Sequence, residues 1–240
     1  MKGGGLLDKL MEDTFDGYRH ELKYYIGCDE ALDLINRLQP VMKFDKYSGP
    51  GGQYLISSVY FDTPDNRSLK ASENGYLKRK KYRIRAYNHN DSFIMLEKKV
   101  KRGNLGYKES VRLTREIYDD ILYGDGKMLL GLENELATEF FTALHIEKYR
   151  PITVVEYKRR AFVHPVSNVR ITLDTDIRGS ASGIDMFYDF NSFVSTVPPC
   201  YTVLEVKYDH FLPDYIRSLL PRQASLQSSI SKYVHGRTYK

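Results

Sequence analysis

The sequence predicts an α+β fold in which about eight antiparallel strands form a closed or nearly closed β-barrel. The first observation behind this prediction is the alternation of charge. Successive side chains of a strand point to opposite faces, so Arg83 shares a face with Arg85, and Lys99 shares a face with Lys101. Like charges crowded onto one face are costly unless a counter-charge lies between them. A barrel whose charged faces line an interior that holds a polyanion avoids this cost, with the apolar faces packed outward against helices.

The second observation is the series of strand-like segments and the turns that join them. Half-buried strands are typically rich in β-branched and aromatic residues that alternate with polar ones. The expected strands are residues 18–26, 54–61, 77–87, 92–101, 107–113, 152–163, 169–177 and 201–208. Polar turns at 88–91 and 103–106 join three charged strands into a meander. The glycine-rich segment 43–53 is expected to be a loop, and 186–190 is a candidate additional strand.

The third observation is helical periodicity between the strands. Asp29 is the expected N-cap of a first helix, which ends before Pro40. Thr63 and Pro64 have the order of a cap and a first helical position. The expected helices are residues 29–38, 64–74, 114–122, 132–146, a short segment that begins at Pro213, and 228–235.

Length and composition indicate a single domain of residues 18–240 behind an N-terminal leader of residues 1–17. The chain has 240 residues, and no linker rich in proline, glycine or serine separates the expected strands. The sequence shows no signal-peptide pattern, and no apolar stretch approaches the roughly 20 residues that span a bilayer. We therefore expect a cytoplasmic protein without a membrane span.

Several kinds of chemistry lack support in the sequence. Cys28 and Cys200 are the only cysteines and have no zinc-site spacing. The sequence contains no GxxxxGK[ST], GxGxxG or HExxH motif. The net charge of +5 is modest, and the basic residues are interleaved with acids inside strands. Nucleic-acid binding is usually indicated by basic clusters on an exposed helix or loop, so we expect no nucleic-acid partner.

The charged faces suggest which residues line the barrel interior. Any one of these faces alone could be an ordinary solvated surface, but their recurrence favours a shared lumen. The inward-facing basic candidates are Lys23, Arg83, Arg85, Lys99, Lys108, Arg159, Arg170, Lys207 and Lys232. The inward-facing acidic candidates are Glu21, Glu97, Glu205 and Asp174. The basic excess suits several phosphates, and carboxylates are ligands for Mg²⁺ or Mn²⁺.

A series of short motifs occurs in a family's order over residues 18–236. The motifs are Glu21-Leu22-Lys23-Tyr24, Tyr60-Phe61-Asp62-Thr63, Arg83-Ile84-Arg85, Glu97-Lys98-Lys99, Gly106-Tyr107-Lys108-Glu109-Ser110-Val111, Tyr157-Lys158-Arg159-Arg160-Ala161-Phe162, Val169-Arg170-Ile171-Thr172-Leu173-Asp174, Leu204-Glu205-Val206-Lys207 and Ser231-Lys232-Tyr233-Val234-His235-Gly236. With them the chain resembles the VTC domain, the polyphosphate polymerase branch of the triphosphate tunnel metalloenzymes (the CYTH-like superfamily).

The resemblance implies a tunnel of antiparallel strands, closed at one end by a C-terminal plug helix, that binds the triphosphate of ATP and passes a growing polyphosphate chain. Carried over at matching positions, the phosphate-binding residues are Lys23, Arg83, Arg85, Lys99, Lys108, Tyr157, Arg159, Arg170, Lys207 and Ser231. Among them Arg83, Arg85 and Lys99 would hold the phosphates in line, and Lys232 would neutralise the transferring group. Glu205 would be the principal metal ligand, with Glu21 and Glu97 as further candidates; Glu205 could instead be a structural counter-ion.

Two positions depart from the family pattern. The ExExK signature of the wider superfamily reads Arg19-x-Glu21-x-Lys23 here, which favours the polymerase branch over a triphosphatase or adenylyl cyclase. Lys101 stands where eukaryotic members carry a histidine.

The expected reaction is metal-dependent transfer of the γ-phosphoryl group of ATP onto polyphosphate, with release of ADP. The alternatives are hydrolysis of inorganic triphosphate or short polyphosphate, and a sensor that binds polyphosphate or nucleotide without turnover. The sequence leaves open the donor nucleotide, the favoured direction, the product length, the oligomeric state and any protein partner.

Overall fold

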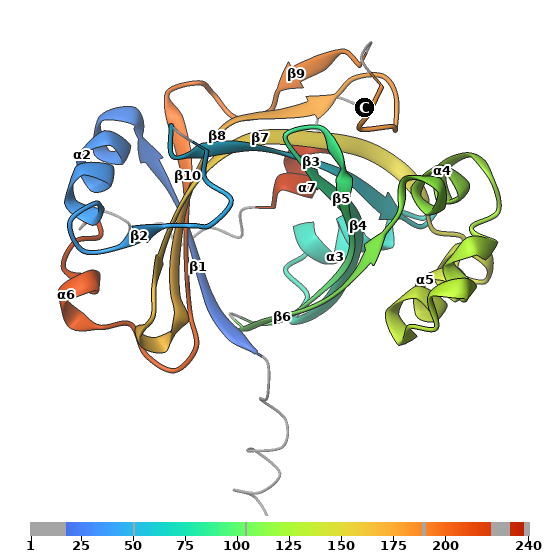
Figure 1. The fold of residues 1–240 in the computed structure, drawn as a ribbon, viewed down its shortest axis with the longest axis horizontal. Coiled ribbons are helices and arrows are strands. Elements are labelled where there is room, and N and C mark those ends of the chain that lie inside the picture. The colour runs from blue at the N-terminus through green and yellow to red at the C-terminus, as the bar shows by residue number, and fades with distance from the viewer. Residues whose placement is uncertain (1–17, 50, 104, 189–190, 222–230, 238–240) are drawn as a thin grey trace, which may run out of the picture.

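A computed structural model describes residues 18–237 apart from 50, 104, 189–190 and 222–230. The expected leader, residues 1–17, lies outside the described residues. Eight strands are hydrogen-bonded to one another in a closed antiparallel ring (Figure 1). In ring order they are β7 (Arg150–His164), β3 (Gln53–Asp62), β4 (Lys78–Tyr87), β5 (Asn90–Arg102), β6 (Leu105–Leu113), β1 (Arg19–Gly27), β10 (Tyr201–Tyr208) and β8 (Val169–Ser180), which pairs again with β7. The predicted α+β class is thus confirmed, as a ring of strands.

Two short strands add to the ring, and the pairing between β1 and β6 within the ring is short. β2 (Lys43–Phe44) pairs with β7, and β9 (Phe193–Ser195) pairs with β8. β1 and β6 share only two residue pairs, Arg19 with Gly106 and His20 with Leu105. β1 pairs with β6 only at its first residues, whereas it pairs with β10 from His20 to Gly27. The short β1–β6 pairing closes the ring.

Helices cover the outside of the ring on opposite sides (Figure 1). α4 (Arg115–Tyr123) and α5 (Glu135–His145) pack Tyr118 and Phe140 against Tyr82 and Ile84 of β4, all completely buried. α2 (Cys28–Leu38) and α6 (Asp214–Arg217) cover a second apolar cluster on β1, β8 and β10, which includes Leu34. The apolar side chains of these two clusters therefore point outward, as the alternation predicted, whereas a third cluster, with Val155 and Val203, packs around Tyr233 of α7.

Two short helices lie together at one end of the ring, α3 (Arg67–Glu73) and α7 (Lys232–Arg237). The Asp62 carboxylate accepts hydrogen bonds from the backbone N–H groups of Ser68 (2.8 Å) and Leu69 (3.0 Å) at the start of α3. Its Oδ2 also accepts a hydrogen bond from the Tyr233 hydroxyl of α7 at 2.6 Å. Asp62 thus caps one helix with charge and fixes the other.

α7 also approaches the ring backbone very closely. A Cβ atom at Gly179 would lie 2.9 Å from the Gly236 Cα, and a Cβ at Gly236 would lie 2.5 Å from the Val155 side chain. The Thr153 hydroxyl donates a hydrogen bond to the Gly236 carbonyl at 3.2 Å. These contacts need glycine at both positions, since any side chain would push α7 away from β7 and β8.

Several expected boundaries were wrong, and tertiary contacts explain them. α3 begins at Arg67, three residues after Pro64, because the Asp62 carboxylate lies over the N–H groups of Ser68 and Leu69. The N-cap of α2 is Gly27, so Asp29 lies in the first turn instead. Three other segments also differ. Residues 43–44 form strand β2 inside the expected loop, and a 3₁₀ helix, η1 (Lys127–Leu132), precedes α5. Of the candidate strand 186–190, residues 186–188 are not in a strand and 189–190 lie outside the described residues, whereas a strand forms at 193–195.

Within the described residues, two further findings complete the fold. A second 3₁₀ turn, η2 (Val166–Asn168), joins β7 to β8. α7 covers residues 232–235 of the last expected helix and continues to 237, and residues 228–230 of that expected helix are not described. None of the helices in the described part of the chain is long and apolar enough to cross a membrane.

Candidate functional site

The ring encloses a cavity of about 470 Å³. Its basic lining residues are Arg19, Lys23, Arg79, Lys81, Arg83, Arg85, Lys99, Lys101, Lys108, Arg159, Arg170, Lys207 and Lys232. The carboxylates in the lining are Glu97 and Glu205. A cavity lined mostly by one sign of charge concentrates the field and attracts polyanions.

Strand alternation determines which member of each basic run reaches the cavity. Lys99 lines the cavity, whereas Lys98 points outward and pairs with Glu139 at 2.5 Å. Arg159 lines the cavity, whereas Lys158 is exposed. The structure places every residue expected to bind phosphate around this one cavity: Lys23, Arg83, Arg85, Lys99, Lys108, Tyr157, Arg159, Arg170, Lys207, Ser231 and Lys232.

Glu97 is surrounded by cations on three sides. Its Oε2 accepts a hydrogen bond from Arg83 Nε at 2.6 Å, and its Oε1 accepts one from Lys108 Nζ at 2.8 Å. Burial by itself would raise the pKa of Glu97, but Arg83, Arg85 and Lys108 outweigh it and hold that pKa well below its usual range. Since both carboxylate oxygens are engaged, Glu97 is a counter-ion that positions Arg83 in the wall.

Glu21 and Glu205 form a second cluster around Lys23. The Lys23 Nζ lies 3.2 Å from Glu21 Oε1 and 3.5 Å from Glu205 Oε2, because β1 pairs Lys23 directly opposite Glu205 on β10. Lys99 Nζ donates to Glu21 Oε1 at 2.7 Å, and Lys207 forms an ion pair with Glu205. No described residue hydrogen-bonds to the buried Glu21 Oε2. This oxygen lies close to Gly106, where an added Cβ would be 3.1 Å away, and Glu21 is not part of the cavity lining.

Asp174 connects α7 to the ring wall. Arg159 donates two hydrogen bonds to its carboxylate, at 2.6 and 2.7 Å, and Lys232 Nζ lies 2.5 Å from its Oδ2. Lys232 Nζ also lies 4.7 Å from the centre of the Tyr157 ring. Burial would raise the pKa of Tyr157, but neighbouring cations, Arg159 foremost, lower it instead. Lys232 is thus held in the cavity by a buried carboxylate and an aromatic face.

Arg85 is a buried cavity cation with an unused hydrogen-bond donor. Its residue is 7% exposed, and its closest carboxylate contact is Glu97 Oε2 at 3.6 Å. None of the described residues accepts a hydrogen bond from its Nε. A buried guanidinium with an unused donor is costly, and phosphate oxygens in the cavity would satisfy it.

Lys81 lines the cavity but was not among the expected site residues. Its Nζ donates to the Ser231 hydroxyl at 2.8 Å and lies 5.3 Å from the centre of the Tyr233 ring. Burial, together with nearby cations such as Lys23, holds the pKa of Lys81 well below its usual range. Strand parity places Lys81 beside Arg83, which is the signal that could have identified it.

Lys99 has a pKa close to neutrality. Burial lowers it most, and the cations Lys23 and Lys207 lower it further, so that the pKa falls to about 7 despite the attraction of Glu21. An added anion would favour the protonated form of Lys99.

Further aromatic residues line the cavity, and one of them, Tyr60, stacks on Tyr233 of α7 with ring centres 5.3 Å apart. Tyr47 and Tyr87 stack with ring centres 5.5 Å apart, and Phe93 lies 5.9 Å from Tyr87. Tyr60 contributes a hydroxyl that accepts a hydrogen bond from Arg83 at 3.2 Å. The charge pattern did not predict these rings. Tyr47 in particular lies in the segment that was predicted as a loop.

A divalent cation fits the Glu21 and Glu205 cluster better than any other part of the cavity. Among the described residues no three histidine, cysteine, aspartate or glutamate side chains are grouped to hold a metal ion. Mg²⁺ and similar ions, however, often use only one or two carboxylates and take their remaining ligands from substrate phosphates and water. Glu205 lines the cavity and Glu21, whose Oε2 accepts no hydrogen bond from a described residue, lies behind it, whereas Glu97 lies in its own cluster with Arg83 and Lys108.

Comparisons with known proteins give one family match and several distant structural likenesses. No functionally curated protein matches the chain. Among solved structures, the PH1012 protein from Pyrococcus horikoshii OT3 is 17% identical, with a TM-score of 0.44, and the match covers 86% of this chain and 93% of that one. A putative adenylate cyclase from Bacillus halodurans is 16% identical, with a TM-score of 0.43 and coverage of 80% and 81%. The PH1819 protein from Pyrococcus horikoshii OT3 is 14% identical, with a TM-score of 0.41 and coverage of 83% and 82%.

The family match covers nearly the whole chain. The model of the VTC domain matches residues 18–239, which include the entire strand ring and α7. The chain belongs to the VTC domain family.

Proposed function

We propose that this protein is a metal-dependent phosphotransferase that moves the γ-phosphoryl group of ATP, or of another nucleoside triphosphate, onto inorganic polyphosphate. The observation that carries the proposal is Arg85, a buried guanidinium with an unused donor inside a strongly basic cavity. A chain of phosphates supplies the acceptors and the negative charge that this wall lacks. The VTC domain match supports the same substrate class.

In the proposed reaction the ring acts as a tunnel that aligns the donor triphosphate with the end of the acceptor chain. A terminal phosphate oxygen of polyphosphate attacks the γ-phosphorus, the bond from that phosphorus to the β–γ bridging oxygen breaks, and the nucleoside diphosphate leaves. Such a transfer depends mainly on positioning and charge neutralisation. Arg83, Arg85 and Lys99 hold the phosphates in line, and Lys232 neutralises charge on the transferring group.

The remaining polar lining binds phosphates on either side of the reacting centre. Each of these side chains is a donor or a cation in the cavity: Lys23, Lys108, Tyr157, Arg159, Arg170, Lys207 and Ser231. No protein nucleophile is required, because the acceptor chain itself supplies the attacking oxygen.

Glu205 and Glu21 would hold Mn²⁺ or Mg²⁺. When bound, the ion would supply positive charge that neutralises the phosphate groups. Glu205→Gln tests this role against a purely structural counter-ion. If Glu205 is a metal ligand, the substitution leaves metal-free triphosphate binding largely unchanged but shifts Mn²⁺-dependent activity to higher Mn²⁺, because an amide oxygen is a weaker donor.

A counter-ion role for Glu205 gives the opposite result. Loss of its charge would strengthen metal-free triphosphate binding and leave the Mn²⁺ activation curve unshifted. Triphosphate binding is measured by calorimetry, and activity by ADP release over a Mn²⁺ series.

Incubation of the purified protein with ATP and Mn²⁺ or Mg²⁺ tests the reaction itself. ADP release together with growth of a phosphate polymer on a gel is the expected result. Release of orthophosphate without polymer would identify a hydrolase of triphosphate or short polyphosphate instead. Tight polyphosphate binding with neither product would identify a sensor.

A further inference from the structure

The two cysteines of the chain meet in space although they are far apart in sequence. β1 and β10 pair as far as Gly27 and Tyr201, and the next residue outward on each strand is a cysteine. The backbone N–H of Cys28 donates a hydrogen bond to the Cys200 carbonyl at 3.1 Å, so the antiparallel register continues through this pair. Since the sequence has no other cysteine, these two residues are the only ones that could form a disulfide within one chain.

The backbone holds the two cysteines at a separation that suits a disulfide. Directly opposed residues of antiparallel strands have Cα atoms about 4.5–5.5 Å apart, and disulfides join cysteines whose Cα atoms are about 4.4–6.8 Å apart. The Cys28 Sγ lies 3.4 Å from the carbonyl oxygen of Pro199, the residue before Cys200, so this thiol is already turned toward the opposite chain segment. Both cysteines are free and exposed, so a small oxidant can reach them.

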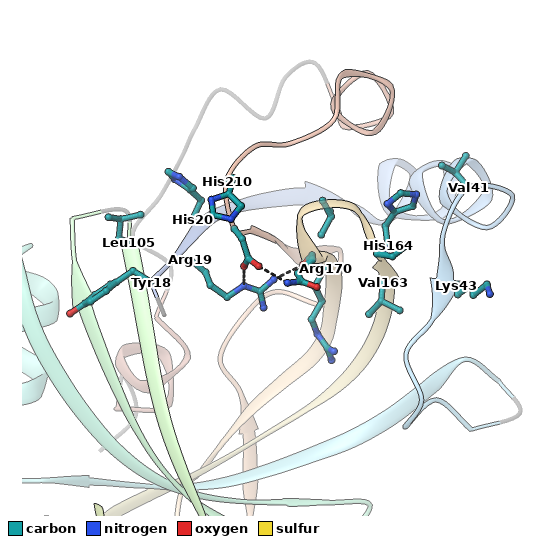
Figure 2. Close-up of a pocket in the computed structure, with 14 residues that line it drawn as sticks. Tyr18, Arg19, His20, Val41, Lys43, Leu105, Val163, His164, Arg170 and His210 are labelled. Carbon is teal, nitrogen blue, oxygen red and sulfur yellow. Dashed lines mark hydrogen bonds and ion pairs between the residues drawn. The ribbon is translucent and has the colours of Figure 1, made fainter. Parts of the chain in front are cut away.

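The cysteine pair is separate from the phosphate-binding wall. Figure 2 shows the other end of β1, where Arg19 and His20 line a second cavity of about 1300 Å³. Neither cysteine is among the described residues that line that cavity or the ring cavity. A change at the cysteines therefore leaves the lining of both cavities intact.

The cysteine pair lies next to contacts that hold α7. The Tyr25 hydroxyl of β1 is 2.5 Å from Nε2 of His235 in α7, and the Tyr25 ring lies edge-on to Tyr201 of β10 with ring centres 6.3 Å apart. Tyr201 directly follows Cys200, and Tyr25 is three residues before Cys28. A covalent bridge between the cysteines would therefore fix the two strand ends beside which α7 docks.

We propose that Cys28 and Cys200 form a reversible disulfide when the protein meets a low-molecular-weight disulfide such as oxidised glutathione. The thiolate of one cysteine attacks a sulfur of oxidised glutathione, the S–S bond of that molecule breaks, and one glutathione leaves as a thiolate. The other cysteine then attacks the protein sulfur of the mixed disulfide and releases the second glutathione. Both cysteines are oxidised, the glutathione disulfide is reduced, and the two released glutathione thiolates take up the two cysteine protons. This inference is independent of the proposed reaction.

The bridge should stabilise the folded protein. It closes a long loop that contains every strand of the ring except β1 and β10. A disulfide stabilises mainly by restricting the unfolded chain, and the effect is larger for longer loops. For a chain of this size the expected rise in Tm on oxidation is roughly 4–16 °C.

The test treats the reduced, purified protein with oxidised glutathione under native conditions. Thiol titration, intact mass, non-reducing electrophoresis and thermal unfolding follow the reaction. In the wild type both thiols should disappear, the mass should fall by two hydrogens, the chain should remain free of intermolecular cross-links, and the Tm should rise; a thiol reductant should reverse all of these changes. Cys28→Ser and Cys200→Ser are matched controls, and each should stop at one mixed disulfide with glutathione and show no such rise in Tm.

Four results would overturn the inference. Wild-type protein that retains two glutathionyl groups would show that the two thiols cannot reach each other. A disulfide between two copies of the chain, or thiols that do not react, would also exclude a bridge within one chain. An oxidised wild type whose Tm does not rise would contradict it too, because the bridge would then form only by distorting the ends of β1 and β10.

Discussion

Individual cations in the ring cavity differ in how fully the protein compensates their charge. Arg83 and Arg159 each hydrogen-bond to a buried carboxylate, at 2.6 Å in both cases. Arg85 has no comparable partner among the described residues. The first two are fixed in place before any ligand arrives, whereas Arg85 has a donor free for the ligand.

We expect Arg85→Ala to weaken triphosphate binding about tenfold to a hundredfold, since a hydrogen bond to a charged group contributes about 1.5–3 kcal/mol. The ligand-free protein should unfold at the same temperature or a higher one, because the variant removes a buried like charge beside Arg83. Calorimetric titration and thermal unfolding measure the two effects. Arg160→Ala, which alters an outward-facing position of β7, is the control, and equal binding by both variants would refute the role of Arg85.

Lys99 leads to a prediction about protons. At about pH 8 a lysine of pKa about 7 is mostly neutral, and a bound polyanion raises its pKa, so binding should take up a proton. Triphosphate affinity should correspondingly fall as pH rises above 7. Calorimetry in two buffers of different ionisation enthalpy measures the uptake.

Lys99→Arg distinguishes proton uptake by Lys99 from proton uptake by the ligand, because arginine is already charged before the ligand binds. The variant should take up fewer protons than the wild type at the same pH. Identical uptake in the two proteins would show that Lys99 is already charged in the free cavity.

At the scale of single elements, α7 depends on close backbone contact as well as on its buried side chains. Its Gly236 lies against Gly179 of β8, and its Tyr233 hydroxyl bonds to Asp62 at the start of α3. The helix has only six residues, so its position is set by these tertiary contacts and not by its own stability.

Gly236→Ala should therefore displace α7 and Lys232 with it. Overpacking costs about 1–3 kcal/mol, which corresponds to a Tm lower by roughly 2–12 °C for a chain of this size. Triphosphate affinity should fall in the same variant. Gly131→Ala is the control, because a Cβ there meets no atom within 4 Å; a Gly236→Ala protein with wild-type Tm and affinity would contradict the close contact.

The strands could be predicted from the sequence because period-two alternation is local. The same rule distinguishes Lys99 from Lys98 by parity alone. Helix starts were less predictable, because α3 begins where the Asp62 carboxylate lies over its N–H groups. Polar partners were not predictable either, because Lys81 and Ser231 are 150 positions apart and meet only after the ring has closed.

At the scale of the whole molecule, the ring gathers cations from strands that are distant in sequence. Triphosphate should raise the Tm far more than the same concentration of orthophosphate or sulfate, because a longer anion contacts several of these cations at once. A ligand that binds only the native state stabilises it by RT ln(1 + [L]/Kd), so the shift reports affinity. Differential scanning fluorimetry at constant ionic strength measures it, and equal shifts for all these anions would indicate general charge neutralisation only.

The position of α7 in the chain has a consequence for biosynthesis. Lys232 is translated after every strand of the ring, although it lies inside the cavity those strands form. During synthesis at about 5–20 residues per second, the ring strands leave the ribosome before α7 does. A nascent chain therefore cannot carry the complete constellation of cations, and Asp174 stays without its Lys232 partner until that last helix emerges and docks.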